Sequence, residues 1–60
     1  MNVQFKYYAK NDEFLFSKTV NVSGFRQARE FASSEIKFNN QYEKIKIFYD
    51  DKEVVTTYED

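Results

Sequence analysis

The chain has 60 residues, with nine basic and ten acidic side chains, a net charge of −1, and neither Cys nor His. This length predicts a single domain over residues 1–60, close to the lower size at which an apolar core alone can hold a fold. The lack of Cys excludes disulfides and thiolate nucleophiles, and the lack of both residue types removes the usual zinc ligands. The balanced charge gives no overall attraction to nucleic acid or to an anionic membrane.

The first part of the chain alternates apolar and polar residues with the period of β-strands. Residues 3–9 and 14–22 predict two strands of a hairpin. A tight turn is expected at Asn11-Asp12, because Asn and Asp tolerate positive φ. The register that follows pairs Tyr7 with Phe16, Val3 with Val20 and, on the outer face, Tyr8 with Leu15. The core face of the hairpin then consists of Val3, Phe5, Tyr7, Phe14, Phe16, Val20 and Val22.

Lys18 interrupts this pattern, because it falls on the core face opposite Phe5. An inward charge of this kind protects an edge strand against pairing with another chain, and a bulge near Ser17 would have a similar effect. A lysine that contacts a ligand is the other interpretation. We therefore expect the second strand to lie at an edge of the sheet.

Residues 24–38 carry apolar side chains at helical spacing. Ser23 is the expected N-cap, and Asn39-Asn40 is expected to end the helix. The apolar arc consists of Phe25, Ala28, Phe31, Ala32 and Ile36. Glu35 falls inside this arc, so that it is either a buried carboxylate, which would suggest catalysis, or part of a last turn that overhangs the sheet.

The last part of the chain predicts a second hairpin, formed by residues 44–49 and 54–59. The expected turn lies at Asp51-Lys52. The corresponding register pairs Tyr49 with Val54 and Ile47 with Thr56 on the core face, and Phe48 with Val55 on the outer face.

The predicted fold is therefore α+β with the element order ββαββ: a four-stranded antiparallel or mixed sheet with one helix packed on one face. A right-handed crossover favours the strand order 2-1-4-3. In length and layout, and in the run Tyr49-Asp50-Asp51-Lys52 at the last turn, the chain resembles the β-grasp immunoglobulin-binding modules of streptococcal surface proteins. The resemblance implies that fold and strand order, but fold does not carry function.

The residue types offer little for catalysis. Without His or Cys there is no ordinary general base near neutral pH and no thiolate, and the one Gly has no phosphate-binding pattern around it. Asp50, Asp51 and Glu53 are oxygen ligands, but their spacing matches no known cation loop. We therefore expect a protein that is not an enzyme, with no catalytic residues, no metal and no cofactor.

Binding remains, and the sequence indicates two surfaces for it. The first is the end of the second hairpin, where an aromatic anchor and an acidic rim would suit a basic groove on a protein partner. It consists of Phe48, Val55, Asp50, Asp51 and Glu53. The alternative is a basic and aromatic sheet face for single-stranded nucleic acid. It consists of Lys6, Tyr8, Tyr42, Lys44 and Lys46.

The frequent use of Asn, Lys, Phe, Tyr and Ile suggests an AT-rich genome. A small chain without catalytic groups is typical of phage and mobile-element proteins that bind and block a host protein or defence complex, and we expect this function here. With no secretory signal and no apolar run that could span a bilayer, the expected location is the host cytoplasm, without membrane association and as a monomer or weak homodimer. A nucleic-acid-binding module and a structural or designed mini-domain are the alternatives.

Overall fold

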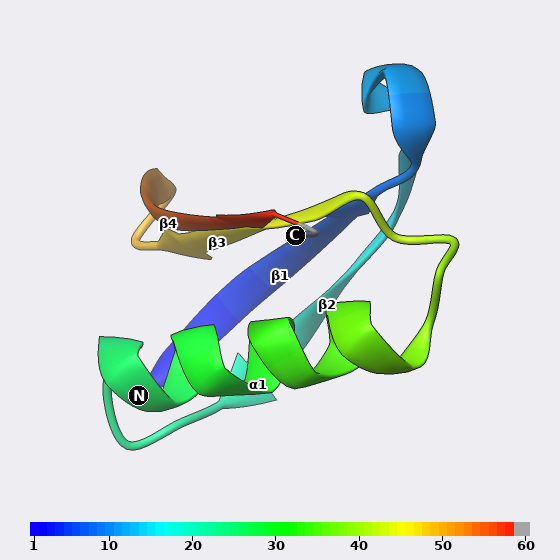
Figure 1. Cartoon of the computed structure of the whole chain (residues 1–60). Helices are drawn as coiled ribbons and strands as arrows, with labels where there is room; N and C mark the ends of the chain where they lie inside the picture. Colours follow the sequence, from blue (N-terminus) through cyan, green and yellow to red (C-terminus); the bar gives the residue numbers. More distant parts are fainter. Residues whose placement is uncertain (59–60) are drawn as a thin grey trace.

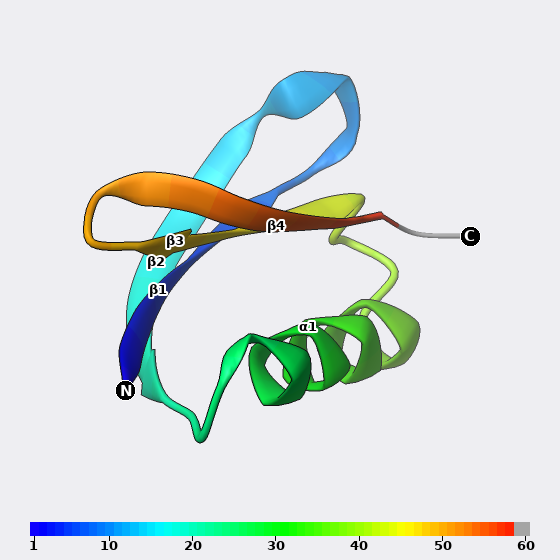
Figure 2. The same cartoon turned by 90° about the vertical axis from the view of Figure 1, so that its left-hand side faces the viewer.

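In the computed structural model, which describes residues 1–58, four strands form one sheet and a helix covers one of its faces (Figure 1). The elements are β1 (Asn2–Tyr8), the short 3-10 helix η1 (Lys10–Asp12), β2 (Phe14–Asn21), α1 (Phe25–Phe38), β3 (Lys44–Tyr49) and β4 (Lys52–Tyr58). The predicted α+β class and the order ββαββ are confirmed. Figure 2 shows α1 on one side of the sheet, with the opposite side uncovered. No helix in residues 1–58 is long and apolar enough to cross a membrane.

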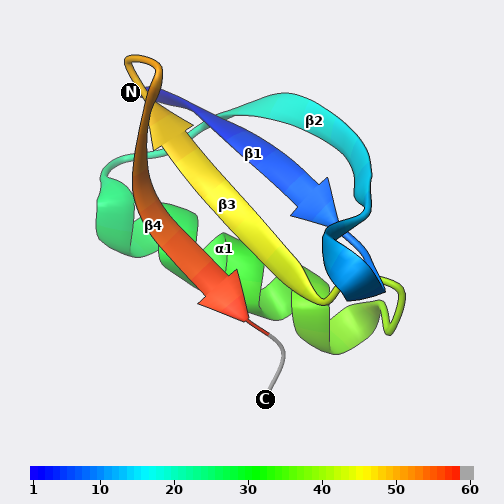
Figure 3. The ribbon, with the colours of Figure 1, turned by 90° about the horizontal axis from the view of Figure 1, so that it is seen from above.

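The strand order is β2-β1-β3-β4, and every neighbouring pair is antiparallel (Figure 3). The predicted order 2-1-4-3 is wrong, and so is the β-grasp order that the resemblance implied. The physical reason lies in β3, whose Ile45 and Ile47 have no exposed surface. Pairing with β1 places Ile47 opposite Phe5 and Ile45 opposite Tyr7, so that the large apolar side chains share the centre of the sheet.

The chain reaches this arrangement through the loop after α1. The backbone N–H of Glu43 donates to the carbonyl of Tyr8 at 2.8 Å, which places the start of β3 beside the end of β1. The strand that follows must then run antiparallel to β1. β4 is left at the edge, where its less apolar sequence is partly exposed.

The core lies between the sheet and α1. It consists of Val3, Phe5, Tyr7, Val22, Ala28, Ala32, Ile36, Ile45 and Ile47. The two alanines allow α1 to approach the sheet closely, whereas Phe25 and Phe31, at the margins of the predicted arc, remain 41% and 43% exposed. The expectation that both phenylalanines are core residues is therefore wrong.

The ends of α1 follow the predicted boundaries with one difference. The N-cap is Gly24, which has no side chain to cap the helix, and not Ser23. The backbone N–H of Ser23 instead donates to the Gln27 side-chain oxygen at 2.6 Å. The helix ends at Phe38 with Asn39 as its C-cap, as the sequence indicated.

The first hairpin has the predicted register over most of its length. Tyr7 lies opposite Phe16, and Lys18 lies on the core face opposite Phe5. The position of β2 at an edge of the sheet is confirmed as well. Asn11 and Asp12 have φ of 66° and 61°, so both residues adopt the positive φ that was expected of the turn.

A register shift after Tyr7 changes the end of this hairpin. Tyr8 lies opposite Phe14, so the predicted pair of Tyr8 with Leu15 is wrong. One extra residue in β2 reverses the faces of the residues before it. Phe14 consequently lies on the outer face against Tyr8 and is 54% exposed, although the sequence placed it in the core.

The second hairpin departs further from the prediction. Its turn is at Asp50-Asp51, whose φ values of 54° and 63° suit a two-residue turn, and not at Asp51-Lys52. Phe48 therefore lies opposite Glu53, and a further shift at Val54 places Val55 opposite Ile47. The predicted pairs of Tyr49 with Val54, Ile47 with Thr56 and Phe48 with Val55 are wrong.

Candidate functional site

The structure separates the residues of the predicted protein-binding site. Phe48, Asp50 and Asp51 line a hollow of about 330 Å³ beside the β3–β4 turn, and Glu53 lies directly opposite Phe48. Val55 lies on the other face, because it pairs with Ile47 and packs against the core. Four of the five residues are thus brought together, but the expected anchor pair does not exist.

The Phe48 ring is also less accessible to a protein partner than an isolated exposed ring would be. The Lys6 Nζ lies 4.5 Å from the centre of the Phe48 ring. The Lys46 Nζ lies 3.7 Å from a carboxylate oxygen of Glu53. Lys6 therefore covers part of the Phe48 ring, and Lys46 neutralises part of the negative charge of the acidic rim.

The uncovered side of the sheet gathers aromatic and basic side chains, and we call this group the open-face cluster. It consists of Lys6, Tyr8, Phe14, Lys44, Lys46 and Phe48. The registers of β1 with β2 and β3 place all six on the same side, opposite α1. Four residues of the predicted nucleic-acid face are members, and Phe14 joins them only because of the register shift in β2.

Tyr42 does not belong to this face. Its ring lies 4.9 Å from Tyr7 and 6.0 Å from Phe16, measured between ring centres, and it packs against the core. Tyr42 lies in the loop between α1 and β3, so no strand alternation constrains its direction. Its assignment to the nucleic-acid face is wrong.

Within the open-face cluster, cations lie over aromatic rings. The Nζ atoms of Lys44 and Lys46 lie 5.4 Å and 5.2 Å from the centre of the Tyr8 ring. Lys44 also contacts the carboxylate of Asp12 in the first turn. That hydrogen bond lowers the pKa of Asp12 from its ordinary value. The cluster is therefore a mixed surface, with lysines in the middle and carboxylates at its margins.

A further surface, which sequence analysis missed, lies along the side of β2. Seven of the eight residues of β2 are exposed, and only Val20 is partly buried. Between β2 and α1 lies a groove of about 240 Å³, which we call the β2–α1 groove. It is lined by Phe5, Lys18, Val20, Phe31, Ser34 and Glu35.

Glu35 lines this groove with a side chain that is 33% exposed, so it is neither a fully buried carboxylate nor out of contact with the sheet. Its carboxylate accepts hydrogen bonds from the Tyr7 hydroxyl and from the Lys18 Nζ, the latter at 3.0 Å. Burial, followed by the bond to Glu35, raises the pKa of the Tyr7 phenol well above its ordinary value. The inward lysine is thus matched by a carboxylate from α1, and the two cross the groove as an ion pair.

Three phenylalanines extend the apolar surface on this side. Phe16 is 40% exposed and stacks on Tyr7, with 4.4 Å between ring centres. Phe38 is 90% exposed, and it follows Phe31 by seven residues, so both lie on the same side of α1. The spacing of Phe31 and Phe38 was visible in the sequence, but only the fold shows that their side of the helix meets an open strand.

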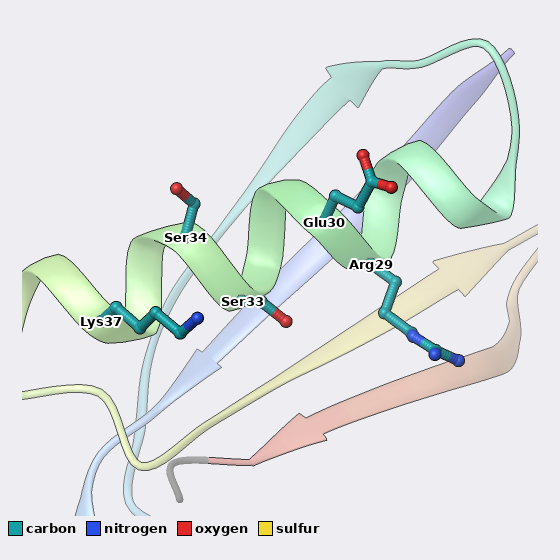
Figure 4. A pocket seen from close by; sticks show the side chains of 5 residues that line it. All are labelled: Arg29, Glu30, Ser33, Ser34 and Lys37. Carbon is teal, nitrogen blue, oxygen red and sulfur yellow. The ribbon is translucent and has the colours of Figure 1, made fainter.

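The outer surface of α1 carries a shallow hollow of about 400 Å³ (Figure 4). Arg29, Ser33 and Lys37 point from α1 toward one side, and Glu30 and Ser34 toward the other. Glu30 is paired with Arg26 at 3.5 Å. This hollow consists of long, solvated side chains, and nothing in its geometry selects a ligand. Within residues 1–58, no three acidic side chains gather closely enough to hold a metal ion.

Comparison with known proteins gave no match: no family model, no curated protein and no solved structure corresponds to this chain. The interpretation of function therefore depends on the surfaces described above.

Proposed function

We propose that this protein is a non-catalytic binding protein that takes up an extended, uncharged segment of a protein partner along β2. The observation that supports this proposal best is the exposure of β2 along nearly its whole length beside an apolar groove. An edge strand presents unpaired N–H and C=O groups, which an added strand can satisfy. Main-chain hydrogen bonds would then supply affinity, and the groove would select side chains.

The two edges of the sheet differ in how well they resist an added strand. β4 begins with Lys52 and Glu53 and contains the extra residue Val54, and charges and bulges are the usual protection of an edge. β2 has the sequence Phe-Leu-Phe-Ser-Lys-Thr-Val-Asn, in which Lys18 is the only charge. Because Glu35 neutralises Lys18, the protection of this edge is weak.

The chemistry of the groove defines the partner segment. Its accessible apolar walls come from Phe31 on α1 and Val20 on the sheet, and the fully buried Phe5 also borders it. A charged side chain placed there would lose water without gaining a counter-ion, because Lys18 and Glu35 already satisfy each other. The segment should therefore carry apolar side chains at alternate positions and no charge in its centre.

A protein of this kind acts by covering the segment that it binds. The expected phage-type inhibitor of a host protein or defence complex is one form of such an activity, in which the covered segment is needed for the partner's own assembly or chemistry. The described surfaces supply adhesion, so the biological effect would come from steric exclusion.

Selection from a displayed library of random peptides against the immobilised chain tests the proposal. The selected peptides should be uncharged, with alternating apolar residues, and their binding should be lost with Phe31→Ser. Phe25→Ser is the matched control, because Phe25 has nearly the same exposure on the same helix but contacts Tyr49 instead of the groove. Circular dichroism would establish that both variants remain folded.

Two outcomes would refute the proposal. One is the selection of charged peptides whose binding is insensitive to Phe31→Ser. The other is binding that depends on Phe25 and Phe31 equally, which would point to a general loss of stability. Light scattering of the free chain shows whether a second copy occupies β2, since each copy carries the same edge.

A further inference from the structure

The open-face cluster contains a pairing that costs stability in the free protein. Lys6 lies directly opposite Lys46 on neighbouring strands, in the centre of the uncovered face. Like charges at directly opposed positions of an antiparallel pair repel each other. Glu53 offsets this repulsion only in part, because its carboxylate oxygen lies 3.7 Å from Lys46 and its side chain is 45% exposed.

Aromatic rings flank this lysine pair along the strands. Tyr8 and Phe14 lie at one end, with 5.6 Å between their ring centres. Phe48 lies at the other end, opposite Gln4. Gln4 and Tyr8 are four residues apart on β1, so the two aromatic ends are separated by about 13 Å at the usual rise of a strand. A cationic centre is thus placed between two ring surfaces.

We propose that this face binds single-stranded nucleic acid, with phosphate held between Lys6 and Lys46 and bases stacked on Tyr8 and Phe48. A bound phosphate would replace the repulsion between the two lysines by attraction to both. Bases stack on aromatic rings regardless of sequence, so the site requires unpaired bases but no particular sequence. Lys6 lies over the ring of Phe48, and Lys44 and Lys46 lie over the ring of Tyr8. A lysine ammonium sits on a flexible four-carbon stem, so these groups can turn toward phosphate and leave the rings to bases.

This inference is independent of the proposed binding along β2. The lysine pair and the ring of Phe48 lie on β1 and β3, on the side of the sheet opposite α1, whereas the β2–α1 groove lies on the helix side. Either proposal can fail without the other.

The test is fluorescence polarisation with single strands of DNA and RNA of about ten nucleotides, a length within the usual range for one module of this size. The slope of log affinity against log salt should fall by about 0.7 for each of Lys6→Gln and Lys46→Gln. Lys37→Gln is the control, because it makes the same charge change on α1, away from this face. Phe48→Ala should weaken binding roughly fivefold or more.

Two further variants should strengthen binding rather than weaken it. A gain of binding cannot be explained by a loss of folded protein. Asp12 and Glu53 compete for Lys44 and Lys46, and their side chains are 75% and 45% exposed. Asp12→Asn and Glu53→Gln should each strengthen binding of the single strand. A duplex of the same length should bind more weakly, because its bases are already stacked.

The proposal is overturned if neither strand binds at low salt, or if Lys6→Gln and Lys37→Gln reduce the salt slope equally. It is also overturned if a polyglutamate peptide of equal charge binds as well as the single strand, because the face would then recognise acidic protein. Equal affinity for duplex and single strand would likewise exclude stacking on Tyr8 and Phe48.

Discussion

The side chain of Phe31 separates the stability of the fold from binding at the β2–α1 groove. A fully buried Phe replaced by Ala costs about 3 to 5 kcal/mol. Phe31 is 43% exposed, so a little more than half of that contact is made inside the protein. We therefore expect Phe31→Ala to lower the free energy of unfolding by about 2 to 3 kcal/mol, in proportion to the buried fraction.

Urea denaturation followed by circular dichroism at the helix band measures this value. A domain of this size has a total stability of about 3 to 9 kcal/mol, so the variant should stay mostly folded at 25 °C if the parent chain exceeds about 4 kcal/mol. The melting temperature should fall by roughly 15 to 25 °C. Phe25→Ala, at 41% exposure, should cost a similar amount of stability but leave binding along β2 unchanged.

Two results would refute this reasoning. A loss of more than about 4 kcal/mol would show that Phe31 is fully buried in solution, and hence that the groove is closed. A loss below about 0.5 kcal/mol is the range of surface substitutions, and it would show that this side of α1 does not face the sheet.

The remaining predictions concern the edge, the buried phenol and the register. Lys18→Val removes from β2 the inward charge that Glu35 already partly neutralises, and it should increase concentration-dependent dimers or aggregates in light scattering relative to the parent chain; a variant no more associated than the parent at high concentration would contradict any remaining protection of the edge by Lys18. The raised pKa of Tyr7 means that its contribution to stability is complete below the unfolded value of about 10 and is lost as the pH rises above it. Between pH 10 and 11.5, Tyr7→Phe should therefore lose on average about 1 kcal/mol less per pH unit than the parent chain in urea titrations. Val55→Ala should destabilise the protein more than Val54→Ala, by about 1 kcal/mol, because Val55 packs against the core and Val54 is an exposed extra residue. A larger loss of stability for Val54→Ala would instead support the hairpin register without a bulge, in which Val54 faces the core.

The sequence was sufficient for those parts of the fold that depend on local pattern. Alternation in residues 3–9 and 14–22 predicted the pairing of Tyr7 with Phe16, and the inward Lys18 correctly marked β2 as an edge. The positive φ of Asn11 and Asp12 followed from their short polar side chains.

The register shifts at Tyr7 and Val54 could not be predicted in this way. A bulge adds one residue to one strand and leaves the alternation on each side intact, yet it exchanges the faces of every residue beyond it. Phe14 and Val55 moved to unexpected faces for this reason. The strand order also escaped prediction, because it depends on which strands bury the most apolar surface together.

The candidate sites likewise divide into one that follows from local sequence pattern and one that depends on the tertiary arrangement. Alternation alone placed Lys6, Tyr8, Lys44 and Lys46 on one face, and the structure brings them together. Prediction of the β2–α1 groove would have needed the strand order, the path of α1 and the degree of burial of Phe31. Local sequence pattern specifies none of these.

Amide hydrogen exchange, followed residue by residue by NMR, tests the central claim most directly. The chain would be compared alone and bound to a peptide selected for affinity. Strand addition predicts slower exchange at alternate residues of β2 between Phe14 and Asn21, with changed signals for Phe31 and Phe38 and no change in residues 48–53. Slower exchange in residues 48–53, with β2 unaffected, would contradict binding along this edge.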